Sequence, residues 1–299
     1  MRFAFLLCVA TLFAPHAAAA PKRKSPAAAP VPAPPPPRWS TLPLPPAMPK
    51  ANATGFVDSG GAKLYFARYG NAKGEPVILL HGGMGNSDHW SHQVPVLTDK
   101  LHVITIDSRG QGRSTRPRSN KKPTYDQMAD DVLAVMDHLE ISKASFVGWS
   151  DGGEIALKLA IHYPKRVAKL VVLGANYDAN GAKKHTKQSR TFGIYSAKCR
   201  ADYAKLSKTP KQYAAVSSWL APIWRSPMGF TKDQLRTIQA PTIIADGDHD
   251  EIIELDQIKE MVTLIPKARL EVFSDTSHFA LWQDPTSVNK VLVDFLGQP

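Results

Sequence analysis

One serine lies in a setting that favours nucleophilic chemistry. Residues 148–152 read Gly-Trp-Ser-Asp-Gly, and they follow an apolar run that predicts a strand and precede a helical pattern. A serine between two glycines at a strand-to-helix turn is the arrangement of a nucleophile elbow, because the tight turn leaves no room for side chains at the flanking positions. A free serine hydroxyl is hardly ionised near neutral pH. Ser150 is therefore a candidate nucleophile that needs a base.

A candidate base and a candidate acid follow Ser150 along the chain, each after a predicted strand. His278 follows the last strand, and residues 245–251 hold four acidic side chains. We predict that Asp250, with Asp248 as the alternative, fixes the tautomer of His278 and stabilises its imidazolium form. The same acids could bind a cation, but the loop lacks the spacing of a dedicated calcium loop. We expect no metal.

A glycine-rich loop supplies a candidate oxyanion hole. Residues 81–85 read His-Gly-Gly-Met-Gly and follow a buried-strand run. Such a hole takes one N–H from this loop and one from the residue after the nucleophile. The sequence therefore predicts Gly83 and Asp151 as donors, with Met84 as the alternative to Gly83. We also expect Asp151, Met84 and Trp149 to contact the substrate.

The elements that position these residues alternate between strands and helices. From residue 62 onward this alternation predicts an α/β fold with a mostly parallel sheet flanked by helices. Residues 62–69 indicate an antiparallel edge pair. The other predicted strands are residues 77–80, 103–106, 144–149, 167–173, 241–245 and 269–273, and the predicted helices are residues 124–139, 151–162, 252–265 and 285–295.

Residues 180–236 interrupt the alternation as an inserted helical cap. Their stretches favour helices and carry aromatic side chains, which either cover Ser150 as a substrate pocket or form the core of the cap. The cap holds twelve Lys or Arg against two Asp, a balance of +10, whereas residues 51–179 and 237–299 together balance to −5. These cations could attract an anionic substrate, contact an acidic surface, or form a solvated face. We expect no nucleic-acid partner.

The N-terminal part of the chain differs in composition from the rest. Residues 1–20 have an early arginine, an apolar run and small residues, a pattern that predicts a cleavable signal peptide and export to the periplasm or medium. Residues 21–50 are rich in Pro and Ala and predict a linker before a domain at 51–299. The two cysteines of the chain are Cys8, in the predicted leader, and Cys199, for which we expect a structural role. No run is long enough for a mature membrane span.

The order Ser150, Asp250, His278 matches that of α/β hydrolases, and residues 51–299 resemble that superfamily. Residues 106–114 look like its structural turn after the fourth strand. The stretches 148–153 and 163–176 resemble the valacyclovir-hydrolase-like serine esterases. This resemblance implies cleavage of α-amino-acid esters, with the Asp151 carboxylate as a receptor for the substrate ammonium group. Asp151 could instead merely support the first helical turn through the helix dipole.

These observations predict a cofactor-free carboxylic-ester hydrolase that acts on a small-molecule ester through an acyl-enzyme. Two alternatives remain open at the level of sequence. The same triad could cleave the C–C bond of a ring-cleavage product, or a lactone. The fold could also serve a ligand-binding protein without catalysis, because fold does not dictate function.

Overall fold

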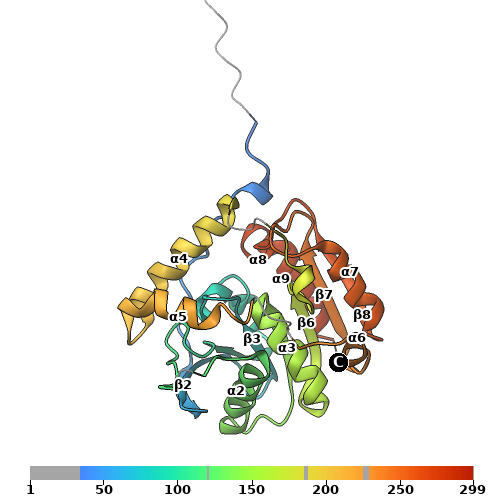
Figure 1. The fold of residues 1–299 in the computed structure, drawn as a ribbon. Helices are drawn as coiled ribbons and strands as arrows, with labels where there is room; N and C mark the ends of the chain where they lie inside the picture. Colours follow the sequence, from blue (N-terminus) through green and yellow to red (C-terminus); the bar gives the residue numbers. More distant parts are fainter. Residues whose placement is uncertain (1–33, 120, 185–187, 225–228, 299) are drawn as a thin grey trace, which may run out of the picture. The chain divides into compact units, whose positions relative to one another are not determined.

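A mixed sheet forms the centre of the unit made by residues 36–299 in the computed structural model (Figure 1). The structure describes residues 34–119, 121–184, 188–224 and 229–298. Within these ranges the sheet has eight strands in the order β1-β2-β4-β3-β5-β6-β7-β8. The strands are β1 (Ala53–Ser59), β2 (Ala62–Gly70), β3 (Glu75–Leu80), β4 (Leu101–Ile106), β5 (Ala144–Trp149), β6 (Val167–Leu173), β7 (Thr242–Gly247) and β8 (Ala268–Phe273).

Strand direction follows the sequence expectation. β2 pairs antiparallel with both β1 and β4, and the pairs from β4 to β8 are parallel. The α-helices are α1 (Val94–Leu97), α2 (Tyr125–His138), α3 (Asp151–His162), α4 (Arg190–Leu206), α5 (Tyr213–Leu220), α6 (Lys232–Arg236), α7 (Leu255–Leu264), α8 (Ala280–Gln283) and α9 (Pro285–Leu296). The predicted α/β class is confirmed.

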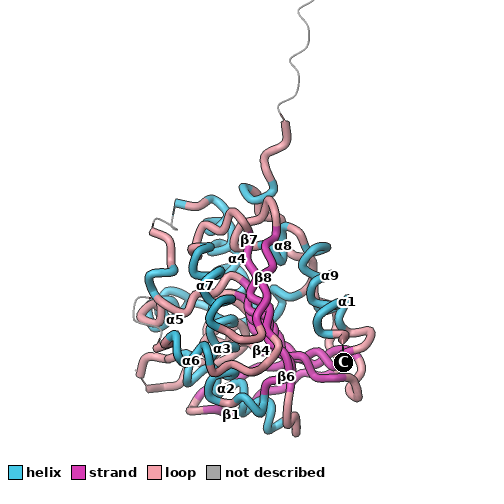
Figure 2. Tube along the Cα trace, turned by 90° about the vertical axis from the view of Figure 1, so that its right-hand side faces the viewer, coloured by secondary structure: helices cyan, strands magenta, loops and turns pink. Residues whose placement is uncertain are grey.

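Helices cover both faces of the sheet, which explains why β4, β5 and β7 are buried along their whole length. In β3, Ile78 and Leu80 pack into a core with α2, α3 and α7, whereas Val77 and Leu79 pack into a second core with α1, α8 and α9. Figure 2 shows α2, α3 and α7 on one side of the strands and α1, α8 and α9 on the other. The carboxyl ends of the parallel strands remain uncovered by these two layers.

The inserted segment between β6 and β7 is helical, as predicted. It contributes α4, α5 and α6, and its described residues form one isolated bridge, between Ala182 and Ile253, but no strand. The structural turn after β4 is held by Asp107, which accepts from the backbone of Ser87, and by a buried ion pair between Arg109 and Asp131 of α2. These contacts agree with an architectural role for residues 106–114.

The N-terminal region differs from the sequence expectation where it is described. Residues 36–50, predicted as linker, belong to the same compact unit as the domain, and Leu42 is buried in it. The predicted signal peptide at 1–20 and the linker up to residue 33 lie outside the described residues. No helix in the described ranges is long and apolar enough to cross a membrane.

Candidate active site

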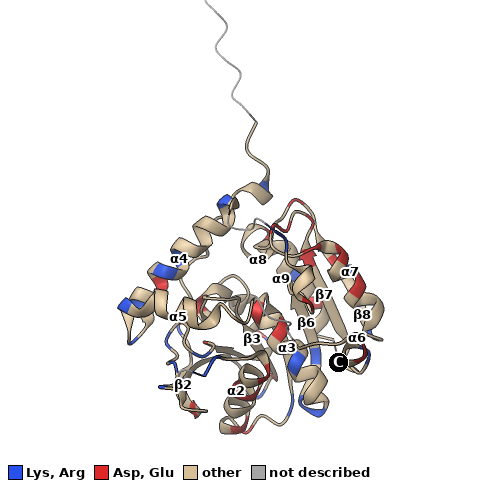
Figure 3. Ribbon diagram, in the orientation of Figure 1, with Lys and Arg blue, Asp and Glu red and all other residues tan. Residues whose placement is uncertain are grey.

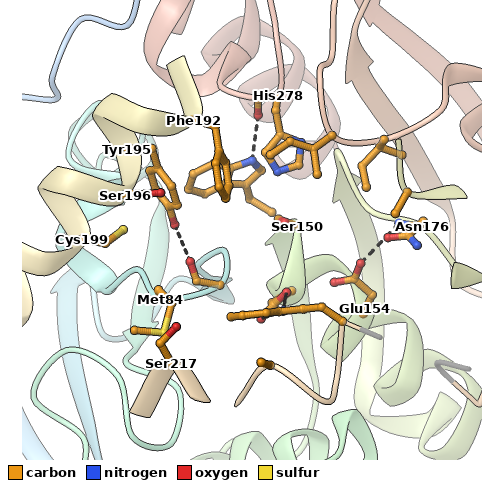
Figure 4. A pocket seen from close by; sticks show the side chains of 18 of the residues that line it. Met84, Ser150, Glu154, Asn176, Phe192, Tyr195, Ser196, Cys199, Ser217 and His278 are labelled. Carbon is orange, nitrogen blue, oxygen red and sulfur yellow. Dashed lines mark hydrogen bonds between the residues drawn. The ribbon is translucent and has the colours of Figure 1, made fainter. Parts of the chain in front are cut away.

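The carboxyl edge of the sheet gathers the residues that the sequence singles out. The glycine-rich loop follows β3, Ser150 follows β5, Asp250 lies in the loop after β7, and His278 lies in the loop after β8. Parallel strands end at the same edge, so loops far apart in sequence meet there. Figure 4 shows Ser150 and His278 on the wall of one pocket beneath the cap.

Ser150 adopts the strained backbone of a nucleophile elbow. Its φ of 53° lies in the left-handed region, which non-glycine residues rarely occupy. A Cβ added at Gly148 would overlap the carbonyl oxygen of Gly152, and one added at Gly152 would overlap that of Leu80. The two glycines are therefore required by the close approach of α3 to β5 and β3, and the turn presents the Ser150 side chain above the sheet.

His278 and Asp250 form a buried pair. Nδ1 of His278 lies 2.7 Å from Oδ2 of Asp250, while Oδ1 of Asp250 accepts the backbone N–H groups of Ile252 and Ile253 at 2.5 and 2.8 Å. Burial is the largest single effect and lowers the pKa of His278. The charge and hydrogen bond of Asp250, with the nearby charges of Glu251 and Asp151, together outweigh it and raise the pKa above 6.5. With Nδ1 held by Asp250, Nε2 is the ring nitrogen left for proton exchange.

The neighbouring acids of the same loop have other partners. Asp248 is partly exposed and accepts from the ring of His249 at 2.8 Å, so it does not contact His278. Asp246 is buried, and burial together with Asp250 raises its pKa well above 3.8, which favours its protonated form. Asp250 is therefore the acid that faces the imidazole.

A metal could in principle use part of this cluster. Ligand atoms of Asp246, Asp250 and His278 lie within 4.8 Å of one another. All three side chains are buried, and the bond between Asp250 and His278 already occupies one oxygen and one nitrogen. This arrangement fits a hydrogen-bonded acid and base better than a set of free ligands, and the expected absence of a metal stays a prediction.

The glycine-rich loop forms a tight turn beside Ser150. Gly85 N–H donates to the carbonyl of Gly82 at 3.0 Å, and Met84 has a φ of 61°. A Cβ added at Gly82 would lie 3.2 Å from Cβ of Ser150, which shows how closely the loop approaches the nucleophile. The loop and the start of α3 thus bring the amides of Gly83, Met84 and Asp151 to the same region as Ser150.

His81 precedes this turn and has a structural role. Its Nε2 accepts the backbone N–H of Ser108 at 3.0 Å, and its Nδ1 lies 2.8 Å from the carbonyl oxygen of Gly82. Burial lowers its pKa to about 4. His81 therefore ties the turn to the loop after β4 and is not placed to act as a base.

Trp149, predicted as a substrate contact, also holds the base in place. Its indole Nε1 donates to the carbonyl oxygen of His278 at 2.9 Å, and its ring packs against Phe279 at 5.8 Å between centroids. Trp149 reaches the pocket wall although it is almost completely buried. One side chain thus links the nucleophile strand to the base loop.

The pocket has a volume of about 890 Å³. Both Ser150 and His278 line it, but no hydrogen bond joins their side chains among the described residues. Core elements and the cap contribute the rest of the wall, which includes Gly83, Met84, Tyr125, Trp149, Asp151, Glu154, Asn176, Phe192, Tyr195, Cys199, Tyr213 and Trp224. The aromatic side chains of the cap therefore have both of the roles expected from the sequence. Some line the pocket, and others, such as Trp219, pack within the cap and against the core.

Two carboxyl groups of α3 face the pocket. Asp151 accepts from Nε1 of Trp224 at 2.9 and 3.1 Å and from the Tyr125 hydroxyl at 3.1 Å. Burial raises the pKa of Asp151 to about 6 despite these bonds. Glu154 lies one turn further along, and its Oε2 has no hydrogen-bond partner. The Asp151 carboxyl group is thus satisfied by hydrogen-bond donors, whereas Oε2 of Glu154 is buried without one, and burial raises the pKa of Glu154 well above 4.5.

Several pocket residues were not predicted from the sequence. Glu154 follows Ser150 by four residues, a spacing that could have placed it on the same side of α3. Tyr195 and Trp224 belong to the cap aromatics considered as a pocket wall, but their bonds to Gly83 and Asp151 give no sequence signal. Tyr125 gives none either, because it reaches the site from an element distant in sequence. Asp246 could be recognised as acidic, but not as the buried neighbour of Asp250.

Comparisons with known proteins agree with this architecture. Residues 75–192 match the family described as alpha/beta hydrolase fold. The chain is 25% identical over 283 residues to the 2-hydroxy-6-oxononadienedioate/2-hydroxy-6-oxononatrienedioate hydrolase of Cupriavidus pinatubonensis, covering 84% of this chain and 98% of the relative.

Two solved structures share the fold over most of the chain. A meta-cleavage product hydrolase from Pseudomonas fluorescens IP01 superposes with a TM-score of 0.68 at 25% identity, covering 81% of this chain and 97% of that one. An N-acyl homoserine lactone degrading enzyme superposes with a TM-score of 0.63 at 28% identity, covering 81% and 100%. Together with the sheet order and the inserted cap, these likenesses show that the chain has the α/β-hydrolase fold.

Proposed function

We propose that the protein is a serine hydrolase that cleaves a carboxylic ester or a lactone through an acyl-enzyme. The observation that carries the proposal is the meeting of three features on one pocket: the Ser150 elbow, the buried pair of His278 and Asp250, and the glycine-rich turn. Nucleophile, base with its acid, and amide donors are the parts that acyl transfer needs.

The chemistry follows from these positions. Ser150 Oγ attacks the substrate carbonyl while its proton passes to Nε2 of His278, and the Asp250 carboxylate stabilises the imidazolium. The developing oxyanion accepts from the Asp151 N–H and from an N–H of the turn, Gly83 or Met84. His278 then gives its proton to the leaving alkoxide, and water repeats the sequence to release the acid. In a lactone the alcohol stays attached to the acyl chain.

The pocket wall carries both acidic and basic side chains, so its charge does not by itself select between neutral and anionic substrates. Asp151 and Glu154 lie on the first two turns of α3, directly after Ser150. The relative from Cupriavidus is named for dioates, which carry two carboxylates. Burial raises the pKa of Glu154 well above 4.5, which favours its protonated form. Lys183 and Arg200 also line the pocket, so a dianion would meet cations as well as the Asp151 carboxyl group. Hydrolysis of a C–C bond in a ring-cleavage product is the second candidate, supported by the likenesses.

Amino-acid esters are a third substrate class, supported by the position of the Asp151 carboxylate on the pocket wall. Both oxygens of Asp151 already accept from Trp224, so an ammonium group would have to share or displace that donor. The Asp151→Asn variant tests this role. A loss confined to amino-acid esters would favour an ammonium receptor, whereas equal effects on amino-acid and simple acyl esters would favour a structural carboxyl group.

The test of the proposed function is a substrate panel of aryl esters, lactones, amino-acid esters and a ring-cleavage product. We expect the wild type to turn over esters or lactones, and Ser150→Ala to lose this activity by roughly 10⁴-fold or more. Ser218→Ala, an exposed serine of α5, is the matched control and should keep full activity. Equal activity of Ser150→Ala and wild type would contradict the proposal.

A further inference from the structure

Tyr195 of the cap contacts the glycine-rich turn directly. Its hydroxyl donates to the carbonyl oxygen of Gly83 at 2.9 Å, although the two residues are 112 positions apart. Figure 4 shows this bond reaching from α4 across the pocket edge. Tyr195 is 6% exposed, so the bond is made in a largely dry environment. The hydroxyl, which also contacts the thiol of Cys199 on the same helix, therefore donates to a backbone group of the candidate oxyanion hole.

The turn that Tyr195 contacts is conformationally unfavourable. Its four residues, 82–85, are closed by the bond from Gly85 N–H to the Gly82 carbonyl. Met84 at the third position has a φ of 61°, while φ of Gly83 is not positive, which is the type II arrangement. A type II turn favours glycine at its third position, because the carbonyl of the central peptide crowds a Cβ there. With methionine at that position the turn needs outside support.

The central peptide of this turn is the group that the tyrosine holds. Types I and II differ by a flip of that peptide, which here joins Gly83 to Met84. The flip would turn the Gly83 carbonyl away from Tyr195 and reverse the direction of the Met84 N–H. Both candidate loop donors of the oxyanion hole, Gly83 and Met84, belong to this turn. A bond to the Gly83 carbonyl therefore fixes the backbone on which the hole depends.

The Tyr195 ring also packs against the other two catalytic segments. Its centroid lies 5.4 Å from that of Trp149, which precedes Ser150, and 5.1 Å from that of Phe279, which follows His278. Further along α4, Asp202 accepts from Asn86 and pairs with His89, so the same helix is joined to the segment after the turn. Helix α4 of the cap is thus held against all three segments by direct contacts.

From these contacts we infer that Tyr195 is a positioning residue, which holds the peptide between Gly83 and Met84 in the orientation that the oxyanion hole requires. The inference rests on the proposed hydrolase function. It assigns the cap a part in assembling the catalytic site, in addition to enclosing the substrate. Removal of the hydroxyl alone should then lower the rate of the chemical step without weakening substrate binding.

Kinetics of Tyr195→Phe test the inference, because phenylalanine keeps the ring and removes the hydrogen bond. We expect kcat to fall about tenfold, the effect of one lost hydrogen bond on the transition state, with KM changed less than twofold. Tyr203→Phe is the matched control: Tyr203 lies on the same helix, is also buried, and its hydroxyl pairs with Thr209 inside the cap. The control should keep kcat. Unchanged kcat in Tyr195→Phe, or a rise in KM alone, would overturn the inference.

A rescue experiment separates turn support from general packing. The Met84→Gly change removes the steric reason for the turn to flip, so the Tyr195→Phe change should cost at least threefold less kcat in that background than in the wild type. A purely structural role of Tyr195 predicts the same cost in both backgrounds. Equal costs would therefore count against the inference.

A crystal structure of Tyr195→Phe gives a readout that needs no activity. We expect the peptide between Gly83 and Met84 to flip and φ of Met84 to become negative. If φ of Met84 is still positive in the Tyr195→Phe structure, the inference is overturned, whatever the activity of the variant. If the wild type cleaves no substrate of the panel, the proposed function fails, and this structure still decides whether Tyr195 holds the turn.

Discussion

The pair of His278 and Asp250 sets the pH range in which Ser150 can be activated. The imidazole must be neutral to accept the serine proton. Burial is the largest effect and lowers its pKa, but the charge and hydrogen bond of Asp250, with the charges of Glu251 and Asp151, together leave the pKa above 6.5. As pH falls through this raised pKa, His278 becomes protonated and kcat/KM should fall. A pH profile of kcat/KM should therefore show an acid limb with its midpoint above 6.5.

The Asp250→Asn variant is the control for this pH profile. Loss of the carboxylate charge removes the largest of the effects that raise the pKa of His278, so the lowering effect of burial weighs more and the acid limb should move to lower pH. The maximal rate should fall by roughly 10⁴-fold, because the imidazolium loses its stabilising charge and the ring its fixed tautomer. An acid limb that stays in place would show that another group controls it.

At this scale the sequence indicates candidate site residues but not the contacts that hold them in place. Ser150 and His278 were predicted from chain order and strand ends, and both line the pocket. The choice between Asp250 and Asp248 required the three-dimensional path of the loop, because both follow the same strand. The bond from Tyr195 to Gly83 could not be predicted, because it depends on how the cap folds over the core.

Among the elements, the junction of β5 and α3 is the most constrained. Gly152 lies where α3 passes the end of β3, and any Cβ would overlap the Leu80 carbonyl oxygen. Backbone atoms cannot yield as a flexible side chain can. We expect Gly152→Ala to lower the free energy of unfolding by about 3 kcal/mol or more. Chemical denaturation monitored by circular dichroism measures this change.

A second glycine provides the matched control for that substitution. Gly193 lies within α4, and a Cβ added there would meet no atom within 4 Å. Alanine is the better helix former, so Gly193→Ala should raise the free energy of unfolding by about 0.5–1 kcal/mol. If both substitutions had similar effects, the steric account of the elbow would be wrong.

Element prediction succeeded where burial produces a simple pattern. The continuous apolar runs of β3, β4 and β5 and the helical periodicity of α2 indicate buried strands and an amphipathic helix. β1 was not predicted as a separate strand, because it lies at the sheet edge and none of its residues is buried. An edge strand of this kind carries little hydrophobic signal.

At the scale of the whole molecule, the start of the described chain is joined to the loop that carries the base. Gln283 donates to the carbonyl oxygens of Arg38, Trp39 and Thr41 and accepts the N–H of Ser277, the neighbour of His278. Trp39 also stacks on His249 with centroids 4.9 Å apart. A segment predicted as linker thus braces both loops that supply the acid and the base.

This brace predicts coupled losses of stability and activity. Gln283→Ala leaves several partly buried backbone groups without partners, so we expect the free energy of unfolding to fall by about 1–3 kcal/mol. We also expect kcat to fall, because the Ser277 backbone is released. Gln239→Ala, at an exposed position, is the control and should change neither quantity. Thermal unfolding measures the first change and steady-state kinetics the second. An unchanged free energy of unfolding and an unchanged kcat in Gln283→Ala would show that Gln283 does not support the two loops.

Charge and cellular location remain predictions at this scale. Figure 3 shows Lys and Arg along α4 and Asp and Glu along α7. Some cap cations have partners, since Lys198 pairs with Asp202 and Lys232 with Glu260. The basic balance of the cap is therefore partly neutralised, and contact with an anionic substrate or surface stays a proposal. Export also stays a proposal, because the predicted signal peptide lies outside the described residues.

The most direct test of the account is covalent labelling by a fluorophosphonate, with the modified residue located by peptide mass spectrometry. The probe reacts with a serine that is activated by a neighbouring base. We predict one adduct, on Ser150, with labelling abolished in Ser150→Ala and strongly slowed in Asp250→Asn. A folded wild-type protein that takes up no label, or equal labelling of the Ser150→Ala variant, would contradict the assignment of Ser150 as the nucleophile.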